Sequence, residues 1–366
     1  MSVVKKSLFV YVVLLFLGSS TWADASKQTY QVLGIGSPGM DLLLPVEESF
    51  LETIPGGKGG SQHIDQENFR KVVKHARGCS TVSGEPLKIA TGGSCANTIK
   101  GLASLGSSCA LFGKVGRDEM GRRFLDKMVS LHITPLLIAT DTPTAQVICL
   151  ITPDHQRTFR YFPGASAEFS EKDLFPELFR GIDLVHIEGY ALYNGTIVEE
   201  SAKLAKKYGA KVSFDLACYE VVERFKERIL KLLPEYVDVV FANEDEVVAL
   251  LGVGPQEGCQ KLSEMCSVAV TLIGKKGCWV GSGDKIFHCP TLPVTVVDTT
   301  GAGDLFAAGF LHGYLNRRPL EECAFNGNVT GSTVVQIQGA EIPHSKWMTV
   351  HETIRTPGRL AIKATP

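Results

Sequence analysis

The motif with the clearest chemical meaning is Asp298-Thr-Thr-Gly-Ala-Gly-Asp304. It follows an apolar run rich in β-forming residues, 292–297, and precedes a helical pattern over 305–315. We therefore expect a helix to begin at the glycines, with its first backbone N–H groups pointing outward at the positive end of the helix dipole. These groups belong to Gly301, Ala302 and Gly303. Such a helix end binds an anion, and small residues let a phosphate approach the backbone closely.

Asp304 is the candidate catalytic base. It falls in the first turn of the expected helix, where a carboxylate can accept a proton from an alcohol that attacks a phosphoryl group. The same helix end tolerates its negative charge. By composition alone, a simple turn followed by a favourable first-turn acid explains these residues equally well, so the assignment depends on the rest of the chain.

The elements around this motif follow an alternating strand and helix pattern from residue 182 onward. Alternation of this kind predicts parallel strands with helices on both faces of the sheet, an α/β fold. We expect strands at 30–35, 109–112, 184–187, 211–215, 237–241 and 268–272, and helices at 68–75, 97–105, 119–130, 196–208, 221–233, 244–251, 255–265 and 326–337. The hairpin-like segments near 42–53 and 145–162 do not fit a parallel sheet and are expected to form a small β lid.

Composition limits the class of protein. The 366 residues include 37 Lys and Arg against 39 Asp and Glu, a formal net charge of −2, which argues against a nucleic-acid binder. With 44% hydrophobic and 21% charged residues, the chain has the composition of a globular protein rather than a disordered or fibrous one.

Residues 1–25 differ from the rest and resemble a secretory leader. Lys5 and Lys6 precede an apolar run at 8–17, and Ala23-Asp-Ala25 follows. Ten apolar residues are too few to span a bilayer, which needs about 20. We therefore expect export or membrane tethering, with any membrane association only through the leader.

The ten cysteines favour a different location. None forms a C-x-x-C pair, and several lie in apolar runs, as Cys149 does, which is typical of buried free thiols in a reducing compartment. The leader suggests an exported protein and the cysteines a cytoplasmic one, and the sequence leaves both open.

The motifs together resemble the ribokinase/PfkB family of sugar and nucleoside kinases. The segment 298–304 is similar to its carboxy-terminal signature, and Gly92-Gly-Ser-Cys-Ala-Asn-Thr98 is similar to its amino-terminal one, continued by 113–118 and Gly121. Asn243-Glu-Asp-Glu246 matches the N-x-x-E motif of the family. The resemblance covers residues 30–345 and implies a ribokinase-like fold, a mostly parallel central sheet flanked by helices, with a small β lid. The kinase domain is expected at 26–350, followed by a C-terminal tail at 351–366.

The resemblance also implies roles for single residues. It makes Asp304 the base and 301–303 the anion hole of an ATP- and Mg²⁺-dependent phosphotransferase. Asn243 and Glu246 lie one helical turn apart and would order Mg²⁺ and the nucleotide phosphates largely through water, since Mg²⁺ keeps several waters. A carboxylate and an amide suit vicinal hydroxyls. The implied substrate contacts are Asp41, Gly92, Gly93 and Asn97.

Alternatives stay open for some of these residues. Asp41 is also explained as a turn residue, and Asn243 as an ordinary helix-opening residue. The segment 271–277 has one residue more than the nucleotide loop of the family, so within this segment only Gly274 and Gly277 are assigned to nucleotide binding, beside Asn243. A monovalent cation remains open as a further cofactor, and the chain is expected to be a monomer or a homodimer.

The substrate is expected to be a small nucleoside or sugar. The first strand region, 32–41, is most similar to the adenosine-kinase branch, and the aromatic residues of 157–162 would stack on a purine base or else pack within the lid. The alternative function is a non-catalytic exported binding protein. A dinucleotide-binding oxidoreductase is disfavoured, because Gly34-x-Gly-x-x-Gly39 is followed by a strand-like segment rather than a helix.

Overall fold

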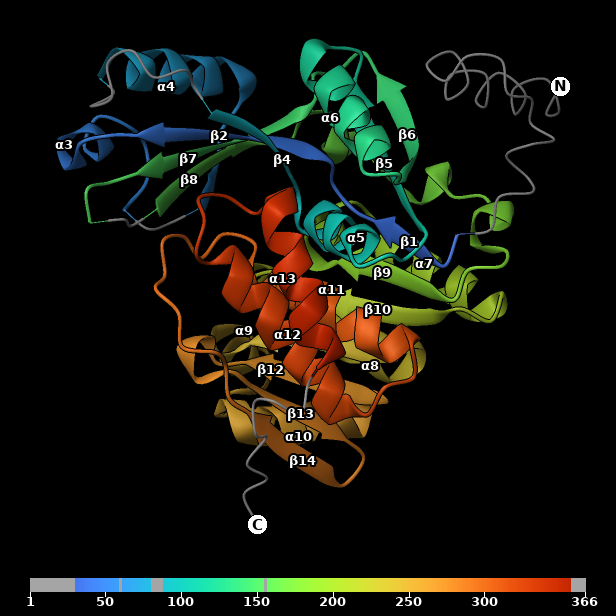
Figure 1. Ribbon diagram of the computed structural model, residues 1–366. Helices are drawn as coiled ribbons and strands as arrows, with labels where there is room; N and C mark the ends of the chain where they lie inside the picture. Colours follow the sequence, from blue (N-terminus) through green and yellow to red (C-terminus); the bar gives the residue numbers. More distant parts are fainter. Residues whose placement is uncertain (1–29, 59–60, 80–87, 155–156, 357–366) are drawn as a thin grey trace, which may run out of the picture.

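The computed structural model describes residues 30–58, 61–79, 88–154 and 157–356. Among these residues, nine strands form a large sheet and five form a smaller one (Figure 1). The order in the large sheet is β14-β13-β12-β11-β10-β9-β1-β5-β6. Its strands are β1 (Val32–Ile35), β5 (Cys109–Gly116), β6 (Thr134–Thr140), β9 (Leu184–Glu188), β10 (Lys211–Asp215), β11 (Val239–Asn243), β12 (Val268–Leu272), β13 (Cys278–Ser282) and β14 (Lys285–Cys289).

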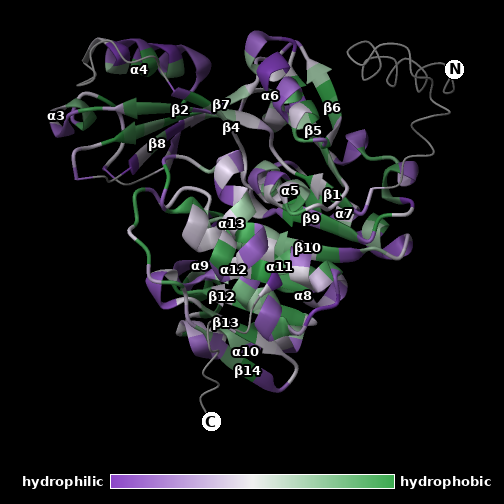
Figure 2. Ribbon diagram, viewed as in Figure 1, coloured by the Kyte–Doolittle hydropathy of each residue, from purple (hydrophilic) through white to green (hydrophobic). Residues whose placement is uncertain are grey.

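The large sheet is parallel from β12 to β6, and only the hairpin β13–β14 at its edge runs antiparallel. Parallel strands are buried on both faces and therefore consist of continuous apolar runs. Figure 2 shows such runs along β9 and β10, with hydrophilic residues on the outer helices. The expected mostly parallel sheet is confirmed, whereas the sequence analysis did not predict β6 or the edge hairpin.

Helices cover both faces of the large sheet and create two separate cores. One core contains Leu33 of β1, and the other contains its neighbour Val32, because successive strand residues face opposite sides. On the Leu33 side lie α7 (Ile197–Lys207), α8 (Tyr219–Tyr236), α9 (Glu244–Leu251) and α10 (Pro255–Met265). On the Val32 side lie α5 (Ser94–Ser104), α6 (Glu119–Ser130), α11 (Ala302–Leu315) and α12 (Leu320–Val334). A last helix, α13 (His344–Arg355), packs on α12.

The smaller sheet has the order β3-β8-β7-β2-β4 and extends from one end of the large sheet (Figure 1). Its strands are β2 (Gly39–Pro45), β3 (Ser61–His63), β4 (Lys88–Gly92), β7 (Ala145–Ile151) and β8 (Arg157–Phe162). Leu42, Phe69 and Ile148 belong to a core beneath α3 (Glu48–Leu51) and α4 (Gln66–Cys79) on one face. The small β lid expected from the sequence is therefore present.

One lid segment differs from its expectation. Residues 145–162 form the antiparallel hairpin β7–β8, but 42–53 forms no hairpin. Instead β2 pairs with β7 in parallel and with β4 in antiparallel orientation, and the chain then enters α3. The reason is tertiary: helical geometry buries both Phe50 and Leu51 in the lid core, which an alternating strand cannot do.

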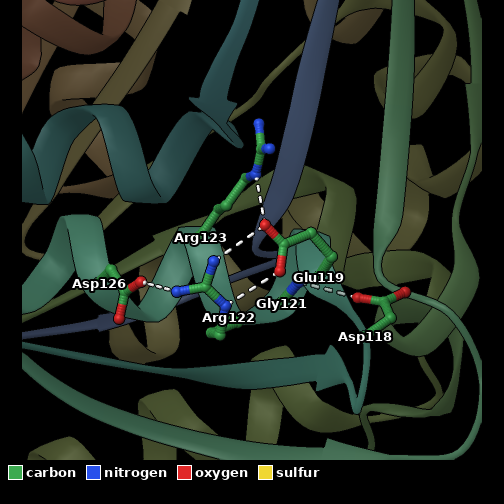
Figure 3. A network of polar contacts seen from close by, with 6 residues as sticks. All are labelled: Asp118, Glu119, Gly121, Arg122, Arg123 and Asp126. Atoms are coloured by element: carbon green, nitrogen blue, oxygen red, sulfur yellow. Dashed lines mark hydrogen bonds and ion pairs between the residues drawn. The ribbon is translucent and has the colours of Figure 1, made fainter.

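Asp118, at the start of α6, ties this helix to the lid. Its Oδ1 accepts a hydrogen bond from the Gly121 N–H at 2.8 Å and another from Thr144 Oγ1 at 2.7 Å, and its Oδ2 accepts one from the Thr144 N–H at 2.9 Å. Figure 3 shows this cap beside an exposed network of ion pairs on α6. The network consists of Glu119, Arg122, Arg123 and Asp126.

The segment 292–297 forms no strand, although its composition favours one. It leaves β14 and runs along α12 instead: the N–H groups of Val297 and Asp298 both donate to Val335 O, at 2.7 and 3.1 Å. Val296 and Val297 are half exposed. The edge of the sheet is already occupied by the hairpin β13–β14, so the segment has no strand partner there.

Both ends of the chain extend beyond the described residues. The helix α13 crosses the domain end expected at residue 350, and the leader at 1–25 and the tail beyond residue 356 lie outside the described residues. In the part that the structure describes, no helix has the length and apolar character that a membrane crossing requires.

The remaining short 3-10 turns are η1 (Gly164–Glu168), η2 (Glu171–Asp173), η3 (Pro176–Phe179), η4 (Gly189–Tyr193) and η5 (Gly274–Lys276).

Candidate active site

A cavity of about 290 Å³ lies where three adjacent parallel strands end. Asp215, Asn243 and Leu272 are the last residues of β10, β11 and β12, and the amino end of α11 faces them. Ligands of open α/β sheets bind at the carboxyl ends of the strands. The full lining consists of Ser94, Tyr190, Asp215, Ala217, Phe241, Ala242, Asn243, Glu246, Leu272, Thr299, Gly301, Ala302, Gly303 and Asp304.

Asp304 lies in the first turn of α11, on the wall of this cavity. Its Oδ1 accepts a hydrogen bond from Ser94 Oγ and its Oδ2 accepts one from Asn97 Nδ2, both at 2.8 Å. Burial raises the pKa of Asp304, while these two hydrogen bonds lower it. The carboxylate is thus held in one orientation and is more basic than an exposed aspartate.

Close packing of α5 against α11 brings Asn97 to Asp304. Gly101 of α5 lies against Ala308 of α11, where a Cβ on Gly101 would be only 2.6 Å from the Ala308 methyl group. The amide oxygen of Asn97 is buried and has no hydrogen-bond partner among the described atoms. The polyol contact expected of Asn97 remains a prediction, and its direct contact in the structure is with the candidate base.

The glycine run begins α11 as the sequence analysis expected. Gly301 is the N-cap residue, with φ of 73°, a left-handed conformation that favours glycine. The Ala302 N–H, however, donates to Thr299 O at 3.2 Å, so it closes a turn rather than pointing freely outward. A Cβ on Gly303 would meet only Leu272, at 3.7 Å, which leaves the backbone there open to a ligand.

Asp298 anchors the beginning of the same loop. Its side chain accepts hydrogen bonds from the N–H groups of Thr300 and Gly339, each at 2.6 Å, and forms an ion pair with Arg157. Arg157 comes from the lid strand β8, and both side chains are at least nine-tenths buried. The sequence analysis considered 157–162 only for its aromatic residues, so this link between lid and loop was missed.

Asn243 and Glu246 form a reciprocal cap at the start of α9. Asn243 Oδ1 accepts from the Glu246 N–H at 2.9 Å, and Glu246 Oε2 accepts from the Asn243 N–H at 2.8 Å. Asn243 Nδ2 also donates to Glu246 Oε1 at 2.6 Å. Asn243 therefore is a helix-opening residue, as the alternative held, but Glu246 is buried and both residues line the cavity.

Asp215 is a cavity residue that the sequence analysis did not single out. Burial raises its pKa to about 7, and the charge of Asp304 adds to the rise. Burial raises the pKa of Glu246 to about 8, with Asp215 as the next contribution. The sequence could have identified Asp215, because it is the last residue of an expected strand. Ligands of parallel sheets bind at the carboxyl ends of the strands, where Asn243 was also expected.

The acidic wall fits a divalent cation held mainly by water and phosphate. Two carboxylates that repel each other in a buried site gain from a neighbouring positive charge. Mg²⁺ usually takes one or two carboxylates and keeps several waters. Across the described ranges, no cluster of three or more His, Cys, Asp or Glu side chains has the arrangement of a complete metal site. The residues Asp215 and Glu246 thus suit a sparse magnesium site.

Asp41 lies on β2 of the lid and is not among the residues that line the cavity. Burial raises its pKa to about 6, while the charge of Lys100 lowers it. Gly92 is directly beside it, since a Cβ on Gly92 would overlap Asp41 Oδ1. The assignment of Asp41 and Gly92 to substrate hydroxyls remains a prediction, but the need for glycine at 92 follows from the space that Asp41 occupies.

Glu188 fixes the connection between lid and large sheet. Its carboxylate accepts hydrogen bonds from the N–H groups of Ser37, at 2.7 Å, and Cys95, at 2.8 Å. Gly93, with φ of 102°, brings its backbone against Ser37 O, where a Cβ would be 2.5 Å away. Gly93 therefore has a structural reason for being glycine, besides the substrate contact expected of it.

Gly274 and Gly277 do not line the cavity; they shape the turn between β12 and β13. Both have positive φ, 55° and 99°, and Ile273 N–H donates to Gly277 O at 2.9 Å. This turn follows Leu272, which does line the cavity. A role in nucleotide binding remains a prediction for both glycines.

The chain is similar to several known proteins in sequence and in fold. Residues 67–347 match the profile described as pfkB family carbohydrate kinase. The chain is 30% identical over 268 residues to the aminoimidazole riboside kinase of Salmonella typhimurium, covering 68% of this chain and 83% of that protein.

Two solved structures have the same fold. The adenosine kinase of Sinorhizobium meliloti superposes with a TM-score of 0.80 at 29% identity, covering 90% of this chain and 100% of that one. A probable sugar kinase from Rhizobium etli gives a TM-score of 0.81 at 27% identity, covering 91% and 100%. The ribokinase-like fold expected from the sequence is confirmed.

Proposed function

The chain belongs to the pfkB family of carbohydrate kinases, and we propose that it transfers the γ-phosphoryl group of ATP to an alcohol of a nucleoside. The observation that carries the proposal is the position of Asp304. It lies at the amino end of α11, beside an open glycine backbone, and Ser94 and Asn97 orient both of its oxygens. A carboxylate so placed can take the proton of an attacking hydroxyl.

The amino end of α11 would stabilise the charge of the transferring phosphoryl group. Backbone N–H groups that are fixed in advance stabilise developing charge without reorganising. In this role we place Gly301 and Gly303, with Ala302 taking part once its turn hydrogen bond to Thr299 opens. Bound Mg²⁺ would neutralise phosphate charge, and Asp215, Asn243 and Glu246 would hold it and its waters.

Aromatic residues around the cleft favour a nucleoside over a free sugar. Tyr190 lines the cavity and is 42% exposed, and Tyr193, three residues further along η4, is 46% exposed. From the lid, Tyr161 packs on His63 with ring centroids 5.6 Å apart, and its pKa is raised by burial and, to a lesser degree, by Tyr193. Flat apolar rings on both sides of a cleft suit a planar base.

The test measures ADP release by the protein that begins at Ser26 and so lacks residues 1–25. The assay contains ATP, Mg²⁺ and a panel of nucleosides and sugars. We expect turnover with a nucleoside and a fall of about 10² or more in kcat for Asp304→Asn, since the amide keeps the size but is no base. Asp126→Asn, in the exposed network of α6, is the matched control and should leave kcat unchanged (Figure 3).

Three outcomes would contradict the proposal. Turnover with sugars alone would reject the nucleoside as substrate. Full activity of Asp304→Asn would reject Asp304 as the base. No turnover with any compound, while ligands still raise the Tm, would instead favour the exported binding protein, which no observation supports at present.

A further inference from the structure

Two cysteines face each other across the edge hairpin of the large sheet. Cys278 of β13 and Cys289 of β14 are directly opposite in the antiparallel register, so their side chains lie on the same face. Opposed residues of an antiparallel pair have Cα atoms about 4.5–5.5 Å apart, and disulfides span Cα distances of about 4.4–6.8 Å. The two strands therefore already have the spacing that a disulfide requires.

The polar contacts of the pair are unequal. Asn328 of α12 points its Nδ2 at Cys289 Sγ, 3.2 Å away, and also donates to Pro290 O at 3.1 Å. Hydrogen bonds from the Cys278 thiol and from Asn328 lower the pKa of Cys289, although burial opposes them, whereas burial raises the pKa of Cys278. Cys289 is the sulfur of the pair that more readily becomes a thiolate.

Other cysteines in the described ranges have a different environment. The thiols of Cys259, Cys266 and Cys323 each point at a backbone carbonyl, and burial raises the pKa of each to about 12. Such thiols are small hydrophobic groups of low reactivity. The pair at 278 and 289 is thus set apart both by its register and by the amide donor.

The pair lies at the base of the turn that carries Gly274 and Gly277. Gly277 directly precedes Cys278, and its backbone approaches Cys289 so closely that a Cβ on Gly277 would overlap Cys289 O. Cys289 is also the last residue of β14, the edge strand of the sheet, where local opening costs least. A small oxidant can therefore reach a pair that is buried in the closed hairpin.

We propose that Cys278 and Cys289 are a reversible disulfide site at the base of this turn. The oxidant is a hydroperoxide. The Cys289 thiolate attacks a peroxide oxygen, the O–O bond breaks, and the leaving oxygen takes a proton, which leaves a sulfenic acid on Cys289. The Cys278 sulfur then attacks the Cys289 sulfur: the S–S bond forms, the S–O bond breaks, and the hydroxyl departs with the thiol proton as water. Two electrons pass from the two thiols to the peroxide.

Peptide mapping tests the site directly and does not depend on kinase activity. Trypsin cuts after Lys276, Lys285 and Arg317, so the disulfide joins peptides 277–285 and 286–317. We expect the native protein treated with hydrogen peroxide to yield this joined pair, and dithiothreitol to separate it. Cys289→Ser and Cys278→Ser should lose the joined pair, and the control Cys323→Ala should keep it.

The wild-type protein alone can overturn the proposal, so the test does not depend on how the variants fold. Recovery of both peptides as separately alkylated species after peroxide treatment would reject the disulfide. A joined pair that forms only after unfolding in urea would reject it as well, because the native register would then play no part.

A second expectation concerns nucleotide binding at this turn, and it rests on the nucleotide-binding role predicted for Gly274 and Gly277. Cross-linking removes the sulfur acceptor of Asn328 and shifts the Cys289 backbone, on which Gly277 packs. We expect oxidised and reduced protein to differ by about fivefold or more in ADP affinity by calorimetry. Equal affinities would overturn this coupling, and failure of the reduced protein to bind ADP would overturn the nucleotide site, while peptide mapping still decides the disulfide.

Discussion

Three carboxylates share one buried wall in this protein. Asp215, Glu246 and Asp304 all line the cavity, and burial raises the pKa of each. At neutral pH their repulsion is a cost that the folded protein bears in the absence of a cation. Functional sites often carry such strain, and removing it tends to stabilise the fold while reducing activity.

Asp215→Asn should therefore raise the Tm of the protein in the absence of Mg²⁺ and nucleotide. The pKa of Asp215, about 7, is above its unfolded value, so its protonated form favours folding and that contribution is lost as the pH rises through about 7. The amide keeps the Oδ1 acceptor for the Ala217 N–H. We expect a gain of about 2 °C or more at pH 8 and a smaller one at pH 6. Thermal melts at both pH values measure it, and a lower Tm at pH 8 would contradict it.

Mg²⁺ affinity should depend on pH for the same reason. The cation needs ionised carboxylates, and Glu246 loses its proton only near pH 8. We expect the apparent Kd for Mg²⁺, measured with ADP present, to fall as the pH rises from 6 to 8. Glu246→Gln should bind Mg²⁺ more weakly and lose most of this dependence. A Kd that is the same at both pH values in the wild type would reject Glu246 as a residue that holds Mg²⁺.

At the scale of elements, the lid and the loop that begins α11 are joined by a buried ion pair. Asp298 is fully buried and Arg157, its partner from β8, is 9% exposed. An ion pair that is buried differs from an exposed one, because removing one partner leaves an uncompensated charge in a medium of low polarity. The exposed pairs of α6 provide a natural contrast (Figure 3).

Arg157→Ala should lower the free energy of unfolding by about 3 kcal/mol, the low end for a broken buried pair, because two N–H groups still bind Asp298. Arg122→Ala, which removes an exposed arginine of α6, should change it by less than about 0.5 kcal/mol. Urea unfolding of both variants measures the difference. Equal effects of the two substitutions would show that the pair contributes no more than a surface contact.

At the scale of the whole molecule, the candidate site draws on both sheets. The expected phosphate and metal residues belong to the large sheet and to α9 and α11, whereas Asp41 belongs to the lid. Three of the four places where the chain passes between the sheets are Ser37, Gly93 and Thr144, and Glu188 and Asp118 hold these three. Binding of the two substrates should therefore affect the two sheets separately.

Hydrogen exchange can resolve this separation. We expect ADP with Mg²⁺ to slow exchange at the amino ends of α9 and α11, and the acceptor substrate to slow it in β2 and β7 of the lid. Protection of ligand-contacting segments follows from their stabilisation on binding. Slowed exchange in β2 with ADP alone, and no further change with the acceptor, would contradict the division.

The local pattern of the chain determined most of the elements, and its separate motifs, taken together, indicated the kinase family. Strands and helices from 182 to 272 were predictable because apolar periodicity there reflects a sheet buried on both faces. The glycines at 301 and 303 and the acid at 304 indicated a helix that begins at an anion site, because that chemistry requires adjacent residues. Features that depend only on residues close together in the sequence can be predicted in this way.

Tertiary structure decided what depends on residues far apart in the chain. Asp298 meets Arg157 across 141 positions of sequence, and Asp304 is oriented by Ser94 and Asn97, more than 200 residues earlier. The strand-like run 292–297 forms no strand because the edge hairpin already occupies that position. The raised pKa values of Asp215 and Glu246 likewise arise from burial and proximity, which no local pattern contains, because both are properties of the packed molecule.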